Sequence, residues 1–101
     1  MHPIVADRKI RIAIVGCGRI AKNHFAAIAA LPDFELVAVC DNDPEILRQH
    51  TEKYGVPGYL RLSDMLEDEV LDVVSICTPS GLHAEQAVEI SQRGVNIITL
   101  G

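Results

Sequence analysis

The chain has 101 residues, of which 49% are hydrophobic and 23% charged, a composition typical of one globular domain rather than of a disordered segment. Nine basic and fourteen acidic residues give a net charge of −5, which disfavours a nucleic-acid groove or an anionic membrane surface as a partner. The longest apolar run, Phe25 to Leu31, has seven residues, whereas a membrane span needs about 20.

The N-terminus and the cysteines indicate a reducing compartment. The first residues have no hydrophobic signal core, which disfavours secretion. Cys17, Cys40 and Cys77 are an odd, widely spaced set without a C-x-x-C pair, so free thiols are expected. We therefore expect a cytoplasmic protein.

The first half of the chain alternates between β-branched runs and helical stripes. It predicts a strand at 10–15, a helix at 19–31, a strand at 35–40 and a second helix that begins after Asp43 and ends at Gly55. Asp43 is expected to cap that helix, followed by Pro44 in its first turn. The apolar stripe of the earlier helix comprises Ala21, Phe25, Ile28 and Ala29.

The second half continues the same alternation. It predicts a weak strand at 58–60, a short capped helix at 63–67, a strand at 72–77, a helix at 81–93 and a strand at 95–99. The longer helix is expected to have Ser80 as its cap and Gly94 just past its end. Its apolar stripe is predicted to include Ala84, Ala87 and Val88.

Apolar strands that alternate with amphipathic helices predict a parallel sheet covered on both faces. Right-handed crossovers then favour a doubly wound α/β fold of the Rossmann type with strand order 3-2-1-4-5 in three αβα layers. Ligands of such folds bind outside the carboxyl ends of the strands where the order reverses, here the first and fourth strands.

The turn after the first strand carries a G-x-G-x-x-A pattern, Gly16 to Ala21, between a strand and a helix. Gly16 permits a tight turn, Gly18 lets the backbone approach a pyrophosphate, and Ala21 lets the helix pack closely. The helix N-terminus then offers unpaired amides to the phosphates. Arg19 adds a charged contact or points to solvent.

Asp41 ends the second strand, twenty residues after Ala21, where a carboxylate can accept hydrogen bonds from both hydroxyls of an adenosine ribose. A 2′-phosphate at about 4 Å would be repelled by roughly 4 kcal/mol at an intermediate dielectric. The neighbours Asn42 and Asp43 offer no compensating cation, so the sequence predicts NAD rather than NADP. A solvated loop carboxylate is the alternative interpretation of Asp41.

The segment after the fourth strand supplies further candidates for the same cleft. Thr78 and Ser80 are placed to line it, although Ser80 also serves as a helix cap, and His83 is either a surface residue or part of the cleft. The three cysteines fall near the carboxyl edge of neighbouring strands, but their spacing matches no metal cluster, and no metal site is predicted.

The motifs together resemble the N-terminal half of the Gfo/Idh/MocA oxidoreductases over residues 9 to 99. The resemblance rests on the segments 12–21, 39–41 and 74–83. Within that family, residues 19–25 and 79–83 are most similar to the UDP-N-acetylglucosaminuronate 3-dehydrogenases of lipopolysaccharide and surface-polysaccharide biosynthesis.

The resemblance implies oxidation of a sugar hydroxyl to a ketone with NAD as the hydride acceptor. It also implies which residues line the cofactor site: Gly16, Gly18, Arg19, Ile20, Asp41, Thr78, Pro79, Ser80, Leu82 and His83.

Family members follow the fifth strand with Glu-Lys-Pro, in which the lysine is the catalytic base, whereas this sequence has Leu100 and Gly101. We therefore expect no catalytic residue here. The expected organisation is an extension at 1–8 and a Rossmann domain at 9–101. A C-terminal substrate domain, in which a nucleotide sugar would bind and through which the whole protein would form a homo-oligomer, is expected to be absent from this chain.

Two other classes of function stay open from the sequence. A stand-alone nucleotide-binding or redox-sensing module would use the same glycine-rich turn without catalysis. An S-adenosylmethionine methyltransferase also has a glycine-rich first turn and an acidic residue after its second strand, but it usually needs two more strands.

Overall fold

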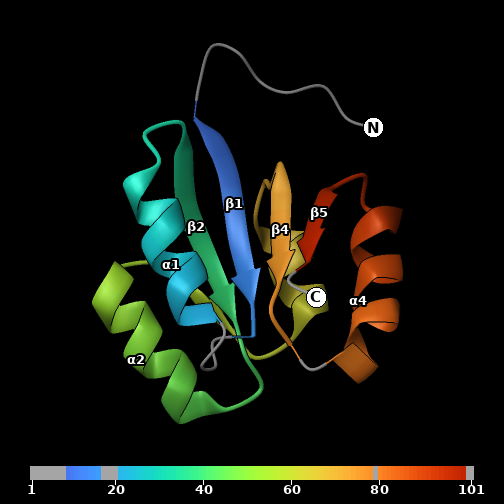
Figure 1. The fold of residues 1–101 in the computed structure, drawn as a ribbon. Helices are drawn as coiled ribbons and strands as arrows, with labels where there is room; N and C mark the ends of the chain where they lie inside the picture. Colours follow the sequence, from blue (N-terminus) through green and yellow to red (C-terminus); the bar gives the residue numbers. More distant parts are fainter. Residues whose placement is uncertain (1–8, 17–20, 79, 100–101) are drawn as a thin grey trace.

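Five parallel strands form one sheet in the order β3-β2-β1-β4-β5, in a computed structural model that describes residues 9–16, 21–78 and 80–99 (Figure 1). The strands are β1 (Ile10–Val15), β2 (Phe34–Cys40), β3 (Gly58–Tyr59), β4 (Val73–Ile76) and β5 (Asn96–Thr99). The helices are α1 (Ala21–Ala30), α2 (Pro44–Tyr54), α3 (Leu62–Asp68) and α4 (Ser80–Gln92). The predicted strand order and Rossmann-type α/β architecture are confirmed.

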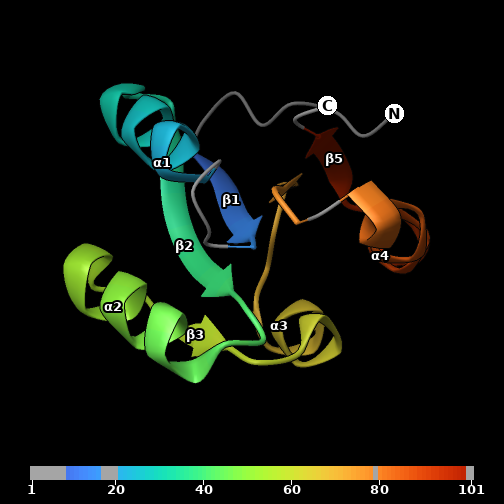
Figure 2. The ribbon, with the colours of Figure 1, turned by 60° about the horizontal axis from the view of Figure 1, so that its bottom comes forward.

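The two faces of the sheet carry separate hydrophobic cores. Figure 2 shows α1 and α2 on one face and α3 and α4 on the other. Along β1 the side chains alternate, so that Ile12 and Ile14 pack with Phe25 of α1, whereas Ala13 and Val15 pack with the opposite layer. This alternation explains why the buried part of β1, from Ile12 to Val15, is apolar on both faces, as expected for a parallel strand covered on both sides.

The register aligns the carboxyl ends of three strands at one edge. Val15 at the end of β1 is paired with Cys40 of β2 on one side and with Ile76 of β4 on the other. Since β2 and β3 lie on one side of β1 and β4 and β5 lie on the other, the helices that follow β1 and β4 cover opposite faces of the sheet (Figure 2). The fold therefore places a cleft where the strand order reverses.

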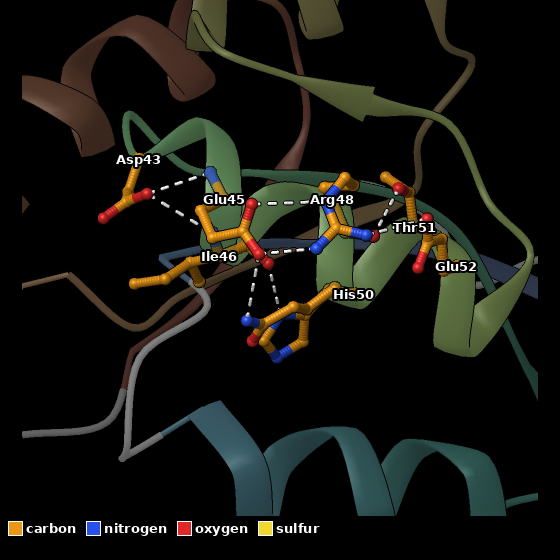
Figure 3. A network of polar contacts seen from close by, with 8 residues as sticks. Asp43, Glu45, Ile46, Arg48, His50, Thr51 and Glu52 are labelled. Atoms are coloured by element: carbon orange, nitrogen blue, oxygen red, sulfur yellow. Dashed lines mark hydrogen bonds and ion pairs between the residues drawn. The ribbon is translucent and has the colours of Figure 1, made fainter.

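Helix α2 has the ends that the sequence predicts. The side chain of Asp43 accepts hydrogen bonds from the amides of Glu45 and Ile46 at 3.0 and 3.3 Å. Gly55 follows the last turn in the left-handed region, with φ of 66°, and its amide donates to the carbonyl of Thr51. Figure 3 shows the N-terminal cap formed by Asp43 together with the exposed ion pairs of Arg48 along the helix.

The start of α3 differs from the prediction. The helix begins at Leu62, and Arg61 at the capping position makes no side-chain hydrogen bond to it. Ser63 therefore lies inside the helix and caps nothing. Leu62, Met65 and Leu66 are the buried residues of this helix, so its position follows from packing against the sheet rather than from a capping side chain.

The face that α4 turns toward the sheet also differs from the prediction. Ala84 is exposed and Val88 is 57% exposed, whereas Ile90 is fully buried and Ala87 packs against the same core. The helix also begins at Ser80, one residue earlier than expected. A stripe of alanines and one valine does not specify which side of a helix is buried, and the position of the sheet decides it here.

The remaining boundaries agree within a residue or two. Strand β2 begins one residue early at Phe34, and β4 is one residue shorter at each end than predicted. The predicted start of the first helix at 19 lies outside the described residues, and α1 ends at Ala30. None of the helices in the described part of the chain combines the length and the apolar character that a membrane crossing requires.

Candidate functional site

A pocket of about 330 Å³ lies at the carboxyl edge of the sheet. It is bounded by the turns after β1, β2 and β4, by the loop between β3 and α3, and by the first two turns of α4. The residues around it are Val15, Gly16, Cys40, Asp41, Asn42, Leu60, Leu62, Cys77, Thr78, Leu82 and Gln86. This is the position at which ligands of doubly wound folds bind.

Gly16 forms the tight turn that the glycine pattern predicts. Its φ is 87°, and its amide donates to the carbonyl of Cys40 at 2.8 Å. A Cβ atom at this position would lie 2.8 Å from both the Cγ2 and the backbone nitrogen of Thr78. Glycine is therefore required by the backbone conformation and by the close contact between the turns after β1 and β4. Gly18, Arg19 and Ile20, the other predicted residues of this turn, lie outside the described residues.

Asp41 stands directly after β2 and lines the pocket. Its amide donates to the carbonyl of Tyr59 at 3.1 Å, which holds the backbone against β3. Its Oδ1 atom accepts a hydrogen bond from the amide of Asp43 at 2.8 Å, which orients the carboxylate. Because none of the described residues that line the pocket is a lysine or an arginine, the carboxylate sets the charge of this part of the pocket.

Thr78 and Leu82 also line this pocket. The hydroxyl of Thr78 donates a hydrogen bond to Oε1 of Gln86, and Leu82 contributes an apolar side chain that is 43% exposed. Ser80 and His83 are the first and fourth residues of α4, which places their backbone beside the pocket. Pro79 lies outside the described residues.

Two buried thiols lie at the floor of the pocket. Cys40 and Cys77 are both buried and unbridged. Burial, together with the charge of the adjacent Asp41, raises the pKa of Cys40 to about 12, and burial also raises the pKa of Cys77. Both thiols are therefore protonated near neutral pH and are poor nucleophiles and metal ligands. The described residues contain no group of three metal-ligating side chains.

Besides Val15 and the two thiols, four lining residues were not among the candidate site residues from the sequence. Asn42 follows Asp41 directly, so its position beside the pocket could have been predicted from the end of the second strand. Leu60 and Leu62 come from the loop after β3, and Gln86 from the second turn of α4. No sequence pattern marks these three, because only the folded arrangement brings their elements to the same edge.

The parallel sheet, the tight glycine turn and the pocket at the reversal of strand order define a dinucleotide-binding Rossmann domain. Comparison with protein families gives the particular class. Residues 10–99 match the Gfo/Idh/MocA family, described as an oxidoreductase family with an NAD-binding Rossmann fold. The chain belongs to this family and is its NAD-binding domain, and NAD(H) is its cofactor.

Solved structures of the same fold include two WlbA dehydrogenases in complex with NADH and UDP-GlcNAcA. The enzyme from Chromobacterium violaceum is 46% identical, with a TM-score of 0.92, and covers 98% of this chain. The enzyme from Bordetella pertussis is 45% identical, with a TM-score of 0.89, and covers 91% of this chain. In each case the match spans 29% of the solved chain.

More distant relatives act on other compounds. The D-apiose dehydrogenase of Paraburkholderia graminis is 34% identical over 90% of this chain, which corresponds to 24% of that enzyme. A scyllo-inositol dehydrogenase from Lactobacillus casei, solved with NAD(H) and scyllo-inositol, is 30% identical, with a TM-score of 0.85, over 91% of this chain and 28% of that one. The chain thus spans about a quarter of the length of the relatives that it matches.

Proposed function

We propose that this chain is the cofactor domain of an enzyme that oxidises a sugar hydroxyl by hydride transfer to NAD. The substrate proposed is a UDP-N-acetylglucosaminuronate-type nucleotide sugar, oxidised at C3 in the cytoplasm for surface-polysaccharide biosynthesis. The proposed binding of NAD is supported by the pocket between the turns after β1, β2 and β4, which Gly16, Asp41 and Thr78 line.

The described pocket residues fit a dinucleotide. The missing Cβ atom at Gly16 lets the tight turn after β1 pack directly against Thr78, which forms the narrow turn that a pyrophosphate-binding loop needs. Asp41 is oriented to accept hydrogen bonds from ribose hydroxyls, while Thr78 and Leu82 also line the pocket. Bound NAD supplies the hydride acceptor, and the protein orients it. From the sequence pattern we add Gly18, Arg19, Ile20, Pro79, Ser80 and His83 to the proposed contacts.

We assign residues 9–101 to this domain and residues 1–8 to an extension. The catalytic base and the substrate domain are proposed to lie in a longer protein, since the match spans only 29% of the length of the solved WlbA chains. That protein is proposed to form a homo-oligomer. The sugar substrate is supported by the 45–46% identity to the WlbA dehydrogenases, against 30% to the scyllo-inositol dehydrogenase. The buried reduced thiols fit the cytoplasm.

Titration of the chain with NADH and NADPH tests the cofactor site. We expect NADH to bind at least about tenfold more tightly than NADPH, because the carboxylate of Asp41 repels a 2′-phosphate at a partly exposed site. Asp41→Ala should weaken NADH binding and remove most of this preference. Asp41→Asn, which keeps an acceptor for the amide of Asp43, should relax the preference while it preserves the turn. Equal binding of both cofactors by the wild type contradicts the assignment of Asp41.

The substrate proposal can be tested with two chimeras. Residues 1–99 would be joined to the remaining part of the Chromobacterium violaceum WlbA dehydrogenase and, separately, to that of the Lactobacillus casei scyllo-inositol dehydrogenase. We expect the WlbA chimera to form NADH in the presence of UDP-GlcNAcA, and the second chimera to be much less active with scyllo-inositol. An inactive WlbA chimera that folds and binds NADH would contradict the proposed substrate class.

A further inference from the structure

Gln86 is a pocket residue to which neither the motifs nor the proposed function gives a role. It lies in the second turn of α4, is partly buried, and lines the pocket one helical turn after Leu82. Residues four apart in a helix share one face, so Leu82 and Gln86 present a single surface to the turn after β4.

Thr78 is held between that surface and Gly16. On one side, its Cγ2 and backbone nitrogen lie where a Cβ atom of residue 16 would come within 2.8 Å. On the other side, its hydroxyl donates to the side-chain oxygen of Gln86. A β-branched side chain has few χ1 rotamers; the hydrogen bond to Gln86 selects one of them, and the missing Cβ atom of Gly16 leaves room for the Cγ2 branch.

We propose that Gln86 is a positioning residue for the cofactor, which acts through Thr78. Its carboxamide oxygen fixes the Thr78 side chain and thereby holds the turn after β4 against the glycine turn, at the wall of the pocket. This inference rests on the proposed function, because it assumes that the cofactor occupies this pocket.

The same contact constrains what Thr78 does for the cofactor. A threonine hydroxyl carries a single proton, and that proton is directed to Gln86. While this hydrogen bond is made, the Thr78 hydroxyl has no second proton to donate to a phosphate oxygen. Thr78 shapes the pocket, and the phosphates are left to backbone amides and other groups.

The test is a double-mutant cycle on NADH binding by the 101-residue chain. Gln86→Met keeps the length of the side chain but removes the acceptor, and Thr78→Val keeps the branched shape but removes the donor. Each should raise the Kd for NADH by about 3- to 10-fold, the value of one hydrogen bond. Because both changes break the same contact, the double variant should bind no more weakly than Thr78→Val alone.

Two further variants separate positioning from general stability. Thr78→Ser retains the donor and should bind NADH nearly as well as the wild type. Gln92→Met is the matched control at the exposed far end of the same helix, and it should leave the Kd unchanged. Thermal unfolding of every variant ensures that binding is compared among folded proteins.

The possible outcomes distinguish this inference from the proposed function. If the wild type binds NADH but the two effects multiply in the double variant, or if Gln86→Met lowers only the melting temperature, Gln86 is not a positioning residue. If the folded wild type does not bind NADH, the proposed function fails, and this inference fails with it.

Discussion

Gly16 meets two independent constraints, one in its own backbone and one in its surroundings. Its φ of 87° is costly for any residue with a Cβ atom, and the space that such an atom would occupy is already filled by the turn after β4. Gly55 shares only the first constraint, since its φ is 66° and no atom lies within 4 Å of the position of a Cβ. The two glycines therefore provide a matched comparison.

We expect Gly55→Ala to lower the free energy of unfolding by about 1–2 kcal/mol, the cost of a left-handed backbone. Gly16→Ala should cost about 3 kcal/mol or more, because backbone atoms of Thr78 and Cys77 must also move. Urea unfolding measures both values. NADH titration should show weaker binding only for Gly16→Ala, and equal effects of the two changes on stability and binding would contradict the close contact.

At the scale of single elements, α2 shows why a capping hydrogen bond contributes more to stability than an ion pair between exposed side chains. Asp43 satisfies two amides that would otherwise lack partners within the helix. Arg48 forms ion pairs with Glu45 and Glu52 on the same helix, but all three side chains are more than half exposed (Figure 3). Water and salt weaken such pairs.

We therefore expect Asp43→Ala to destabilise the chain by about 1 kcal/mol, the usual contribution of an N-cap. Arg48→Ala should cost less than about 0.5 kcal/mol, despite its larger number of polar contacts. Urea unfolding at low and at high salt checks both values, with salt reducing only the effect of Arg48. A larger cost for Arg48→Ala than for Asp43→Ala would disprove this ranking.

At the scale of the whole molecule, the connection from β3 across the sheet to β4 creates the cleft. Residues of β1 and β3 form hydrogen bonds with the last residues of this connection, just before β4 begins. The Tyr59 hydroxyl donates to Oε2 of Glu69 at 2.6 Å, and Nε of Arg11 donates to the carbonyl of Val70 at 2.7 Å. The amide of Arg11 also donates to the Asp72 carboxylate at 2.8 Å. These contacts tie β1 and β3 to the segment that delivers β4 beside β1.

The Tyr59 contact makes this connection sensitive to alkaline pH. The hydrogen bond to Glu69, followed by burial and the charges of Glu69 and Asp68, raises the pKa of Tyr59 to about 12 from its ordinary value of 10.0. A folded-state pKa above the unfolded value means that the stabilisation is complete below about pH 10 and is lost as the pH rises toward 12. Ultraviolet absorbance should show a tyrosinate transition near pH 12 that is missing in Tyr59→Phe.

The Tyr59→Phe variant should also be less stable than the wild type by about 1 kcal/mol at neutral pH. Its free energy of unfolding should fall less steeply between pH 10 and 12, since the variant has no such hydrogen bond to lose. Urea unfolding across this range measures the difference. Parallel decreases in the wild type and the variant would exclude Tyr59 as the alkaline-sensitive group.

Local pattern determined much of this protein. The alternation of β-branched runs with amphipathic helices predicted the sheet and its order, because parallel strands need crossovers and crossovers have one hand. Asp43, Pro44 and Gly55 predicted the ends of α2, because caps act within a few residues. The turn at Gly16 and the carboxylate at Asp41 were also predicted, since each is defined by its distance from a strand end.

Tertiary structure decided what local pattern leaves open. The buried side of α4 falls on Ala87 and Ile90 rather than on Ala84 and Val88, because the place where the helix meets the sheet depends on the whole fold. The start of α3 follows its buried side chains rather than a cap. The contact of Gln86 with Thr78 joins a helix to a strand end. Its partners become neighbours only when β1, β4 and α4 pack together, so only the folded chain could reveal it.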